Sequence, residues 1–523
     1  MRTRNYRIDR DRPARPERPE SVPLSLRDLV VMNLAFIMPT IPYLLYSDIV
    51  KAAHGASAAA FWFAALTVGL TVFNFIKIAR SYPGGASVYH FIAEGAHRNA
   101  GFVASWALFL FYLSVPVTAL ILSAQLISKT SGVPFLLVII AFAAFAFAVN
   151  YIGPRIAAKV CLVCLCIVIA FTIIYILVCV LAVGKGAGVG HVVSSVPYKG
   201  SGAGFGSAFL GGGVVLLAFL GFDSSNTLAA EAEHDRNIIP RSFVITCVIA
   251  GLFIFLQLYV SGLIVRYSQE TADLTLIDIA LKAGGKTLMV LYSTGIIIAC
   301  LLAVTAGQSA AARLLFALGR AGALPKHIFA RRDAKPDPRR RVPLINLLMV
   351  SLLTLLLCAL SSQLPLLIGI SRFMGAFVLL AVNVTMLLHG FFAKNDHNIV
   401  TALIVPALGI FGSLAAWIGV TPKQFLFGIL WLVIGAVLSG IIPGTHEHGD
   451  AIGRGAGGHD IDNAGSRSAS GLSRHGSDGV TSKDDRPHRK ENEGPGFGRR
   501  EKREKDILSD KSFRLPPSRD RRF

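Results

Sequence analysis

The chain has 523 residues, of which 53% are hydrophobic, and its mean hydropathy is +0.58. Apolar runs recur from about residue 26 to 443, and many are as long as the roughly 17–25 residues that a bilayer span needs, which excludes an ordinary soluble domain. The formal net charge of +20 is concentrated in the two tails and in certain loops, so we expect no nucleic-acid partner.

The apolar runs predict about twelve membrane spans. They lack the apolar/polar alternation of barrel strands, so the backbone must satisfy its own hydrogen bonds as α-helices. We therefore expect an all-α polytopic membrane protein with membrane lipid around it. The spans fall near residues 28–50, 57–79, 101–129, 134–152, 157–183, 206–232, 241–265, 286–318, 343–361, 364–392, 399–419 and 424–443.

Both ends of the chain differ from this middle part. Residues 1–25 are rich in Arg and Pro and lack the apolar core of a signal peptide, while residues 444–523 are rich in Gly, Ser and charged residues. Such compositions are typical of disordered tails. We expect a transmembrane domain at 26–443 between two disordered tails.

The loops predict the orientation of the chain. If the N-terminus is cytoplasmic, Arg155, Lys159, Arg241 and the basic run at 326–341 all lie inside, and the opposite loops hold only scattered cations. This is the asymmetry that the positive-inside rule describes. We expect a multi-pass protein of the cytoplasmic or plasma membrane with both tails in the cytoplasm.

Two spans contain residues that interrupt helices. Pro39 and Pro42 lie in the first run and remove two backbone donors, and the glycines at 211–213 and Gly221 lie in the sixth. Broken helices in a membrane are tolerated where they face protein or a wet cavity, and breaks in corresponding spans of two repeats indicate the central site of a transporter. The alternative is a pair of ordinary kinks in continuous helices.

Asp223 is the first candidate for a functional residue. It follows Gly221 within an apolar run, where an ionisable side chain costs at least about 2.5–3.5 kcal/mol on insertion scales. Such a group usually faces a cavity on a substrate or ion path.

Three stretches together resemble the amino acid/polyamine/organocation (APC) permeases. Phe219-Leu220-Gly221-Phe222-Asp223 is similar to the sixth-helix signature of that family. The stretch 81–89 resembles the end of its second helix, and the stretch 310–325 resembles the exit of its eighth helix. The resemblance covers roughly residues 25–443. It implies a LeuT-like fold, with two inverted five-helix repeats plus two C-terminal helices, and secondary transport of amino acids or related amines by alternating access.

The resemblance also implies the positions of the substrate site. Asp223 falls where many relatives carry an acid, and it becomes the candidate for proton coupling. Three further residues are candidates for the lining of the cavity: Trp106, Tyr112 and Thr305, each with helix packing as the alternative. The substrate-binding positions that the resemblance implies are Met38, Pro39, Thr40, Ile41, Pro42, Ala218, Phe219, Leu220, Gly221 and Phe222.

Two departures from the family pattern leave the ligand and the coupling ion open. Relatives often have glycines whose N–H groups hold a carboxylate at the first break, whereas Pro39 and Pro42 have no N–H to offer. Some relatives carry a lysine midway along the fifth helix in place of a sodium ion, and the sequence around Val168 is apolar. We favour proton coupling or exchange over sodium, and the oligomeric state stays open.

Other classes of function find little support in the sequence. It holds no phosphate-binding loop and no nucleophile elbow, so we expect no enzyme and no cofactor. The spacing Cys161-x-x-Cys164-x-Cys166 lies within an apolar helix and is read as packing rather than as a metal site. The alternative function is a non-transporting sensor of amines or amino acids, which would bind its ligand in the same pocket without flux.

Overall fold

The computed structural model describes residues 23–37, 41–81, 88–201, 204–233, 235, 237–330, 343–392 and 398–441. The chain separates into two units, residues 1–457 and 458–523, and all the described residues belong to the first. The candidate residues Met38, Pro39 and Thr40 lie outside the described residues, as does nearly all of both predicted tails.

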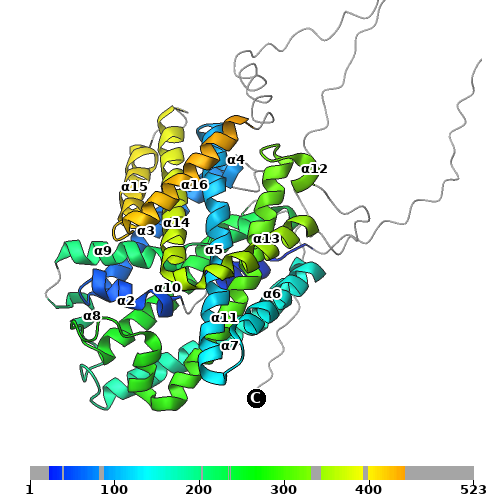
Figure 1. The fold of residues 1–523 in the computed structure, drawn as a ribbon. Helices are drawn as coiled ribbons and strands as arrows, with labels where there is room; N and C mark the ends of the chain where they lie inside the picture. The colour runs from blue at the N-terminus through cyan, green and yellow to red at the C-terminus, as the bar shows by residue number, and fades with distance from the viewer. Residues whose placement is uncertain are drawn as a thin grey trace, which may run out of the picture. The chain divides into compact units, whose positions relative to one another are not determined.

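The prediction of an all-α protein is confirmed, since the described residues form helices and no strand (Figure 1). Their one strand-like contact is an isolated bridge between Leu24 and Ala232. The helices are α1 Leu26–Ile37, α2 Pro42–Ala52, α3 Ser57–Ser81, α4 Val88–Gly95, α5 Arg98–Ser131, α6 Phe135–Ile152, α7 Pro154–Gly184, α8 Val196–Lys199, α9 Phe205–Val215, η1 Leu216–Phe219, η2 Ser224–Glu231, α10 Ile238–Ile264, α11 Leu276–Arg320, α12 Lys326–Phe329, α13 Leu344–Leu357, η3 Cys358–Gln363, α14 Leu364–Phe392, η4 Val400–Ile404, α15 Val405–Ala415 and α16 Pro422–Ile441.

The first apolar run is divided into two helices. Helix α1 ends at Ile37, α2 begins at Pro42, and their axes are bent by 58°. Pro42 stands at the first position of α2, where its missing N–H costs nothing because that donor has no partner within a helix.

The sixth run is also interrupted, but the glycine triplet is not the break. Residues 211–213 continue α9, which passes into the 3₁₀ helix η1, and regular helix ends only at Phe219. The triplet instead allows close packing, because a Cβ added to Gly211 would lie 2.6 Å from Cβ of Ala53, and one on Gly213 would lie 2.2 Å from the carbonyl oxygen of Ala415. The prediction that these glycines break the helix was therefore wrong.

Among the described residues, nine helices are long and apolar enough to cross a membrane, or ten if α1 and α2 count as one bent span. The stretch Leu344–Gly390 counts once although it holds both α13 and α14, and Val400–Ala415 is a shorter apolar helix. The predicted count of about twelve stays a prediction.

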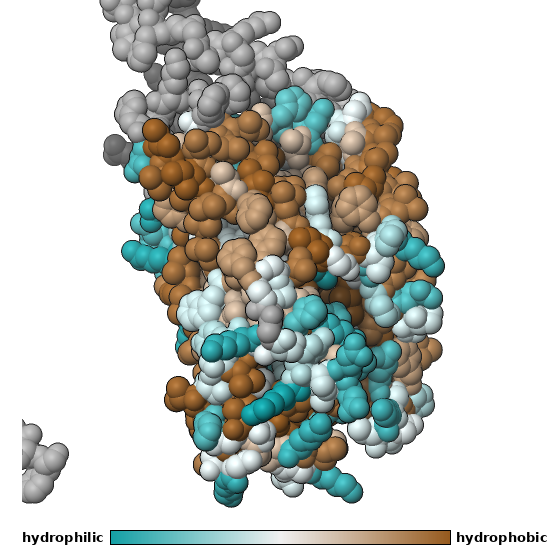
Figure 2. Space-filling model, turned by 90° about the vertical axis from the view of Figure 1, so that its left-hand side faces the viewer, coloured by the Kyte–Doolittle hydropathy of each residue, from teal (hydrophilic) through white to brown (hydrophobic). Residues whose placement is uncertain are grey.

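The outer surface is apolar over wide areas. Figure 2 shows a broad hydrophobic region on one face, with hydrophilic residues gathered mainly below it. Large side chains such as Leu66, Val163 and Leu426 are more than 60% exposed. Soluble monomers rarely expose contiguous apolar patches beyond a few hundred Å², so this surface fits contact with lipid.

The interior is built around α1, α5 and α11. Helix α5 lies along α11 and α14 (Figure 1). The short α1 packs against α7, α10 and α11. Helix α3 packs against α9, α10 and α15. Most residues of α1 are buried, as is 67% of the most apolar window of the sixth run, so both interrupted runs contribute to the interior.

Candidate functional site

The site begins with four residues that are not helical, Leu220 to Asp223. Leu220 is extended, with ψ at 135°. Gly221 has φ at +101°, a backbone conformation that residues other than glycine rarely adopt. Space also requires glycine here, because an added Cβ would lie 2.1 Å from Cδ1 of Phe36 on α1. Helix α1 thus packs directly on the unwound backbone.

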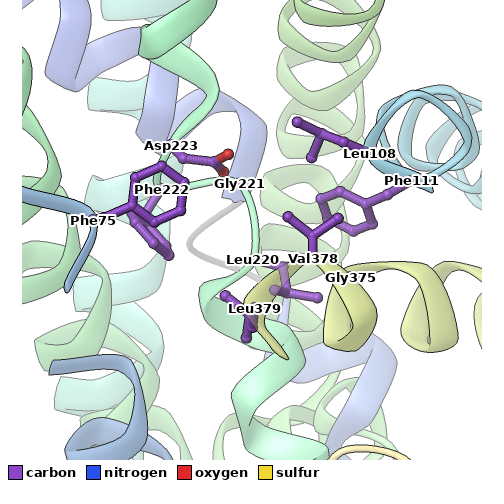
Figure 3. Close-up of a pocket in the computed structure, with 10 residues that line it drawn as sticks. All are labelled: Phe75, Leu108, Phe111, Leu220, Gly221, Phe222, Asp223, Gly375, Val378 and Leu379. Carbon is purple, nitrogen blue, oxygen red and sulfur yellow. The ribbon is translucent and has the colours of Figure 1, made fainter. Parts of the chain in front are cut away.

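A small cavity adjoins this segment. It has a volume of about 10 Å³ for the centre of a water-sized sphere, which is about the room for one water molecule. Figure 3 shows walls of apolar side chains, with the carboxylate of Asp223 directed towards the side on which Leu108 and Phe111 lie. Of the described residues that line it, only Asp223 is ionisable. The lining residues are Phe75, Leu108, Phe111, Leu220, Gly221, Phe222, Asp223, Gly375, Val378 and Leu379.

Asp223 is buried and meets a hydroxyl rather than a cation. Its side chain is 5% exposed, and Oδ2 accepts a hydrogen bond of 3.1 Å from the hydroxyl of Tyr112 on α5. Among the described residues, no lysine, arginine or histidine forms an ion pair with this carboxylate. A buried anion without a counter-charge is costly, so the site favours a proton or a cation at this position.

Asn33 holds the start of η2, directly after the unwound segment. Its Oδ1 accepts hydrogen bonds from the backbone N–H of Ser225 (2.7 Å) and the hydroxyl of Ser224 (2.8 Å). Its Nδ2 donates to the hydroxyls of Ser225 (3.1 Å) and Thr246 (3.3 Å), and Ser225 also shares a hydrogen bond with Ser242. One fully buried amide thereby joins α1, η2 and α10.

An ion pair closes the end of η2. Arg313 on α11 donates from Nη2 to Oε2 of Glu231 (3.2 Å) and from Nε to Oε1 (3.3 Å), a two-point geometry that fixes orientation as well as distance. The same end of η2 binds the residues before α1, because Leu24 N–H donates to the Glu231 carbonyl (2.8 Å) and Glu233 N–H donates to the Leu24 carbonyl (3.1 Å). The two interrupted runs and α11 are therefore tied together at this end.

The predicted substrate residues separate into two groups. Leu220, Gly221 and Phe222 line the cavity, as does Asp223. Ala218 and Phe219 are buried outside the lining, and Phe219 faces Phe61 of α3 at a ring distance of 6.1 Å. At the first break, Ile41 is half-buried and precedes α2, and Pro42 is buried as its first residue.

The predicted cavity residues also differ in their surroundings. Tyr112 reaches Asp223, although it is not itself part of the lining. Trp106 stacks on Trp431 of α16 with the ring centroids 4.7 Å apart, so it packs between helices, which was the alternative to lining the cavity. Thr305 is buried on α11, where its carbonyl accepts a hydrogen bond from Asn150 (2.9 Å).

Several residues of the site carry no signal that sequence reasoning could use. Phe75, Leu108 and Val378 are apolar residues within apolar spans, so nothing distinguishes them from residues that face lipid. Asn33 does carry a signal, because it is an amide in the otherwise apolar first run. For metals, the described residues contain no group of three His, Cys, Asp or Glu placed to hold an ion.

The sequence matches a family model described as "Amino acid permease" over residues 29–447. It is 25% identical over 428 residues to the low-affinity putrescine importer PlaP of Escherichia coli K12, which covers 79% of this chain and 92% of the relative. It is 24% identical over 448 residues to the branched-chain amino acid permease BcaP of Lactococcus lactis, covering 79% and 93%.

Two solved structures share the fold. A manganese transporter of Eremococcus coleocola matches with a TM-score of 0.52 at 14% identity, covering 80% of this chain and 96% of that one. A Na⁺-coupled sialic acid symporter matches with a TM-score of 0.50 at 10% identity, covering 77% and 90%. At these identities the likeness shows the fold alone, and it confirms the predicted LeuT-like arrangement.

Proposed function

We propose that the chain, which belongs to the amino acid permease family within the APC superfamily, moves small amines or amino acids across the membrane by secondary active transport with alternating access. The family is one of multi-pass membrane transporters and not a class of enzymes. The observation that carries the proposal is the buried carboxylate of Asp223 on an unwound segment that meets the end of α1.

We infer that the ligand carries an ammonium group. Among the described residues, the lining offers one acid and no base, so it suits a cation better than a free carboxylate. The C-terminal end of α1 adds partial negative charge nearby, because the last carbonyls of a helix have no partner within it. The cavity has room for about one water molecule, so its walls must move apart to admit such a ligand, and the apolar side chains of Leu108, Phe111 and Val378 would then contact its carbon chain. A relative named as a putrescine importer supports an amine, and one named as a branched-chain amino acid permease supports an apolar amino acid.

We also propose that Asp223 couples transport to protons or to exchange. A carboxylate that is charged when exposed and neutralised when buried can carry one proton per cycle, or can release its proton when an ammonium group arrives. The hydroxyl of Tyr112 can donate to the charged form and accept from the protonated form, so it serves both states.

The test is uptake of radiolabelled amines and amino acids into proteoliposomes, with an inward proton gradient, an outward one or none. Wild type is compared with Asp223→Asn and with Asp235→Asn, a carboxylate that is 44% exposed and pairs with Arg241 outside the cavity. We expect gradient-driven uptake to be lost in Asp223→Asn and kept in Asp235→Asn. Uptake driven by the inward proton gradient would indicate symport, and uptake driven by the outward gradient would indicate exchange. Equal uptake by Asp223→Asn and wild type would refute the coupling role, and ligands that bind without flux would indicate a sensor.

We place the protein in the plasma membrane with both termini in the cytoplasm, on the charge asymmetry of its loops, and we assign the transport domain to residues 26–443 between two tails. A C-terminal fusion to alkaline phosphatase, which is active only outside the cytoplasm, tests the orientation. The fusion should be inactive, and activity would reverse the proposed topology.

A further inference from the structure

A second pocket lies on an exposed face of α3, away from the central cavity. It has a volume of about 270 Å³ and is lined by Phe73, Ile76, Lys77 and Arg80. These positions are spaced i, i+3, i+4 and i+7, so they form one face of the helix. The central cavity receives a different residue of the same helix, Phe75, so the two sites are separate.

The face that holds this pocket changes character along the helix. Its first part is apolar and exposed, with Trp62 at 56%, Leu66 at 62% and Phe73 at 43%. An added Cβ at Gly69 would meet no other atom within 4 Å, so this part of the face is open. The face ends in the cations of Lys77 and Arg80, and Arg80 lies in the last turn of the helix.

This order of side chains matches an amphiphile that stands parallel to the helix. A hydrocarbon chain would lie along the apolar part, and the charged head would meet the two cations. Lys77 supplies a point charge, and the guanidinium of Arg80 supplies a planar fork that suits phosphate oxygens. Basic pockets beside transmembrane helices on the cytoplasmic side are suited to anionic head groups, and the proposed topology puts this end of α3 on that side.

We propose that this pocket binds an anionic phospholipid, with its phosphate held between Lys77 and Arg80 and its acyl chain along Phe73 and Leu66. A free phosphate would make no use of the apolar part of the face, and a lipid without net charge would gain less from the two cations. The proposal concerns binding, and it stands or falls independently of the transported substrate.

The experiment uses the full chain in detergent, titrated with phosphatidylglycerol or with phosphatidylcholine of the same acyl chains and followed by native mass spectrometry. The test variant is Lys77→Gln/Arg80→Gln. The matched control is Arg155→Gln/Lys159→Gln, two exposed cations one turn apart at the start of α7, which the proposed topology puts on the same side. We expect phosphatidylglycerol to bind the test variant about thirtyfold more weakly than wild type, since each surface cation contributes about a fivefold effect. The control should bind as wild type does.

Three results would overturn the proposal. Equal losses in the two double variants would show diffuse attraction by positive charge, and equal affinity for the two lipids would show that the charge of the head group plays no part. Displacement of the lipid by millimolar inorganic phosphate would assign the pocket to a free anion. If the double variant does not fold, Arg80→Gln alone, at an exposed position, should still weaken binding about fivefold, and an unchanged affinity would likewise contradict the proposal.

Discussion

The hydroxyl of Tyr112 donates a hydrogen bond of 3.1 Å to Oδ2 of Asp223 and thereby connects the continuous helix α5 to the unwound segment of the sixth run. Within the described residues, no other side chain hydrogen-bonds to this carboxylate. The proposed coupling group is therefore held by one phenol on a helix that does not break.

This geometry predicts the effect of Tyr112→Phe. Removing the hydroxyl leaves the buried carboxylate without its donor, and hydrogen bonds to charged groups contribute about 1.5–3 kcal/mol, so gradient-driven uptake at low substrate concentration should fall at least about tenfold. Uptake assays in proteoliposomes measure this. Tyr198→Phe, at a 39% exposed tyrosine near the end of α8, is the control and should transport normally. Normal uptake by Tyr112→Phe would show that Asp223 works without this partner.

The conformation of Gly221 predicts that Gly221→Ala abolishes transport and lowers thermal stability. Its φ of +101° strains any side chain by about 1–3 kcal/mol, and the new Cβ would collide with the ring of Phe36. Thermal unfolding of the detergent-solubilised protein and uptake assays give the two readouts. Gly69→Ala is the matched control, because a Cβ there meets nothing within 4 Å and alanine favours helix. A Gly221→Ala protein as stable as the control would mean that the segment readily takes another shape.

The hydrogen bonds of Asn33 predict that Asn33→Ala destabilises the protein. The substitution leaves the N–H of Ser225 and nearby hydroxyls unpaired in the interior, which should cost about 1–3 kcal/mol and lower the melting temperature by several degrees. Asn237→Ala, at the start of α10, serves as the control because no side-chain cap bond is formed there. A melting temperature equal to that of the control would show that the hydrogen bonds of Asn33 do not stabilise the site.

The sequence predicted the helical class and both interrupted runs because breakers and apolar runs act locally. Pro42 fixes its own φ, and Gly221 permits a positive φ. Asp223 can be recognised because it is a charged residue within an apolar run. The walls of the cavity could not be predicted in this way. Leu108, Phe111 and Val378 line the cavity only because α5 and α14 pack against the unwound segment. Phe219 directly precedes the lining residue Leu220, yet its ring faces Phe61 of α3.

The conformation of the glycine triplet at 211–213 also could not be predicted from the sequence alone. Glycine is compatible with both helix and turn, so its sequence indicates a weak point without fixing the outcome. Here the close approach of α3, α2 and α15 holds residues 211–213 in a helix, and the break moves to Gly221, where the backbone must take a positive φ.

The pair of Arg313 and Glu231 predicts a gate at the end where η2, α11 and the residues before α1 meet. The side chains are 5% and 14% exposed, so the pair is well shielded from solvent and removing one partner leaves a charge in poor surroundings. We expect Arg313→Gln to open this end more often. In inside-out vesicles, a cysteine introduced by Asn226→Cys, a 3% exposed position of η2, should react several times faster with a membrane-impermeant maleimide when Arg313→Gln is also present.

The control for this measurement is Arg241→Gln, which removes an exposed ion pair with Asp235 near the same end. It should leave the rate of labelling unchanged, and peptide mass spectrometry separates the introduced cysteine from the seven native ones. The reversed pair Glu231→Arg/Arg313→Glu should bring the rate back towards that of the intact pair, because attraction between the two side chains is restored. Labelling that stays equally slow in Arg313→Gln would show that the contacts of Leu24 with the Glu231 and Glu233 backbones are enough to keep this end closed.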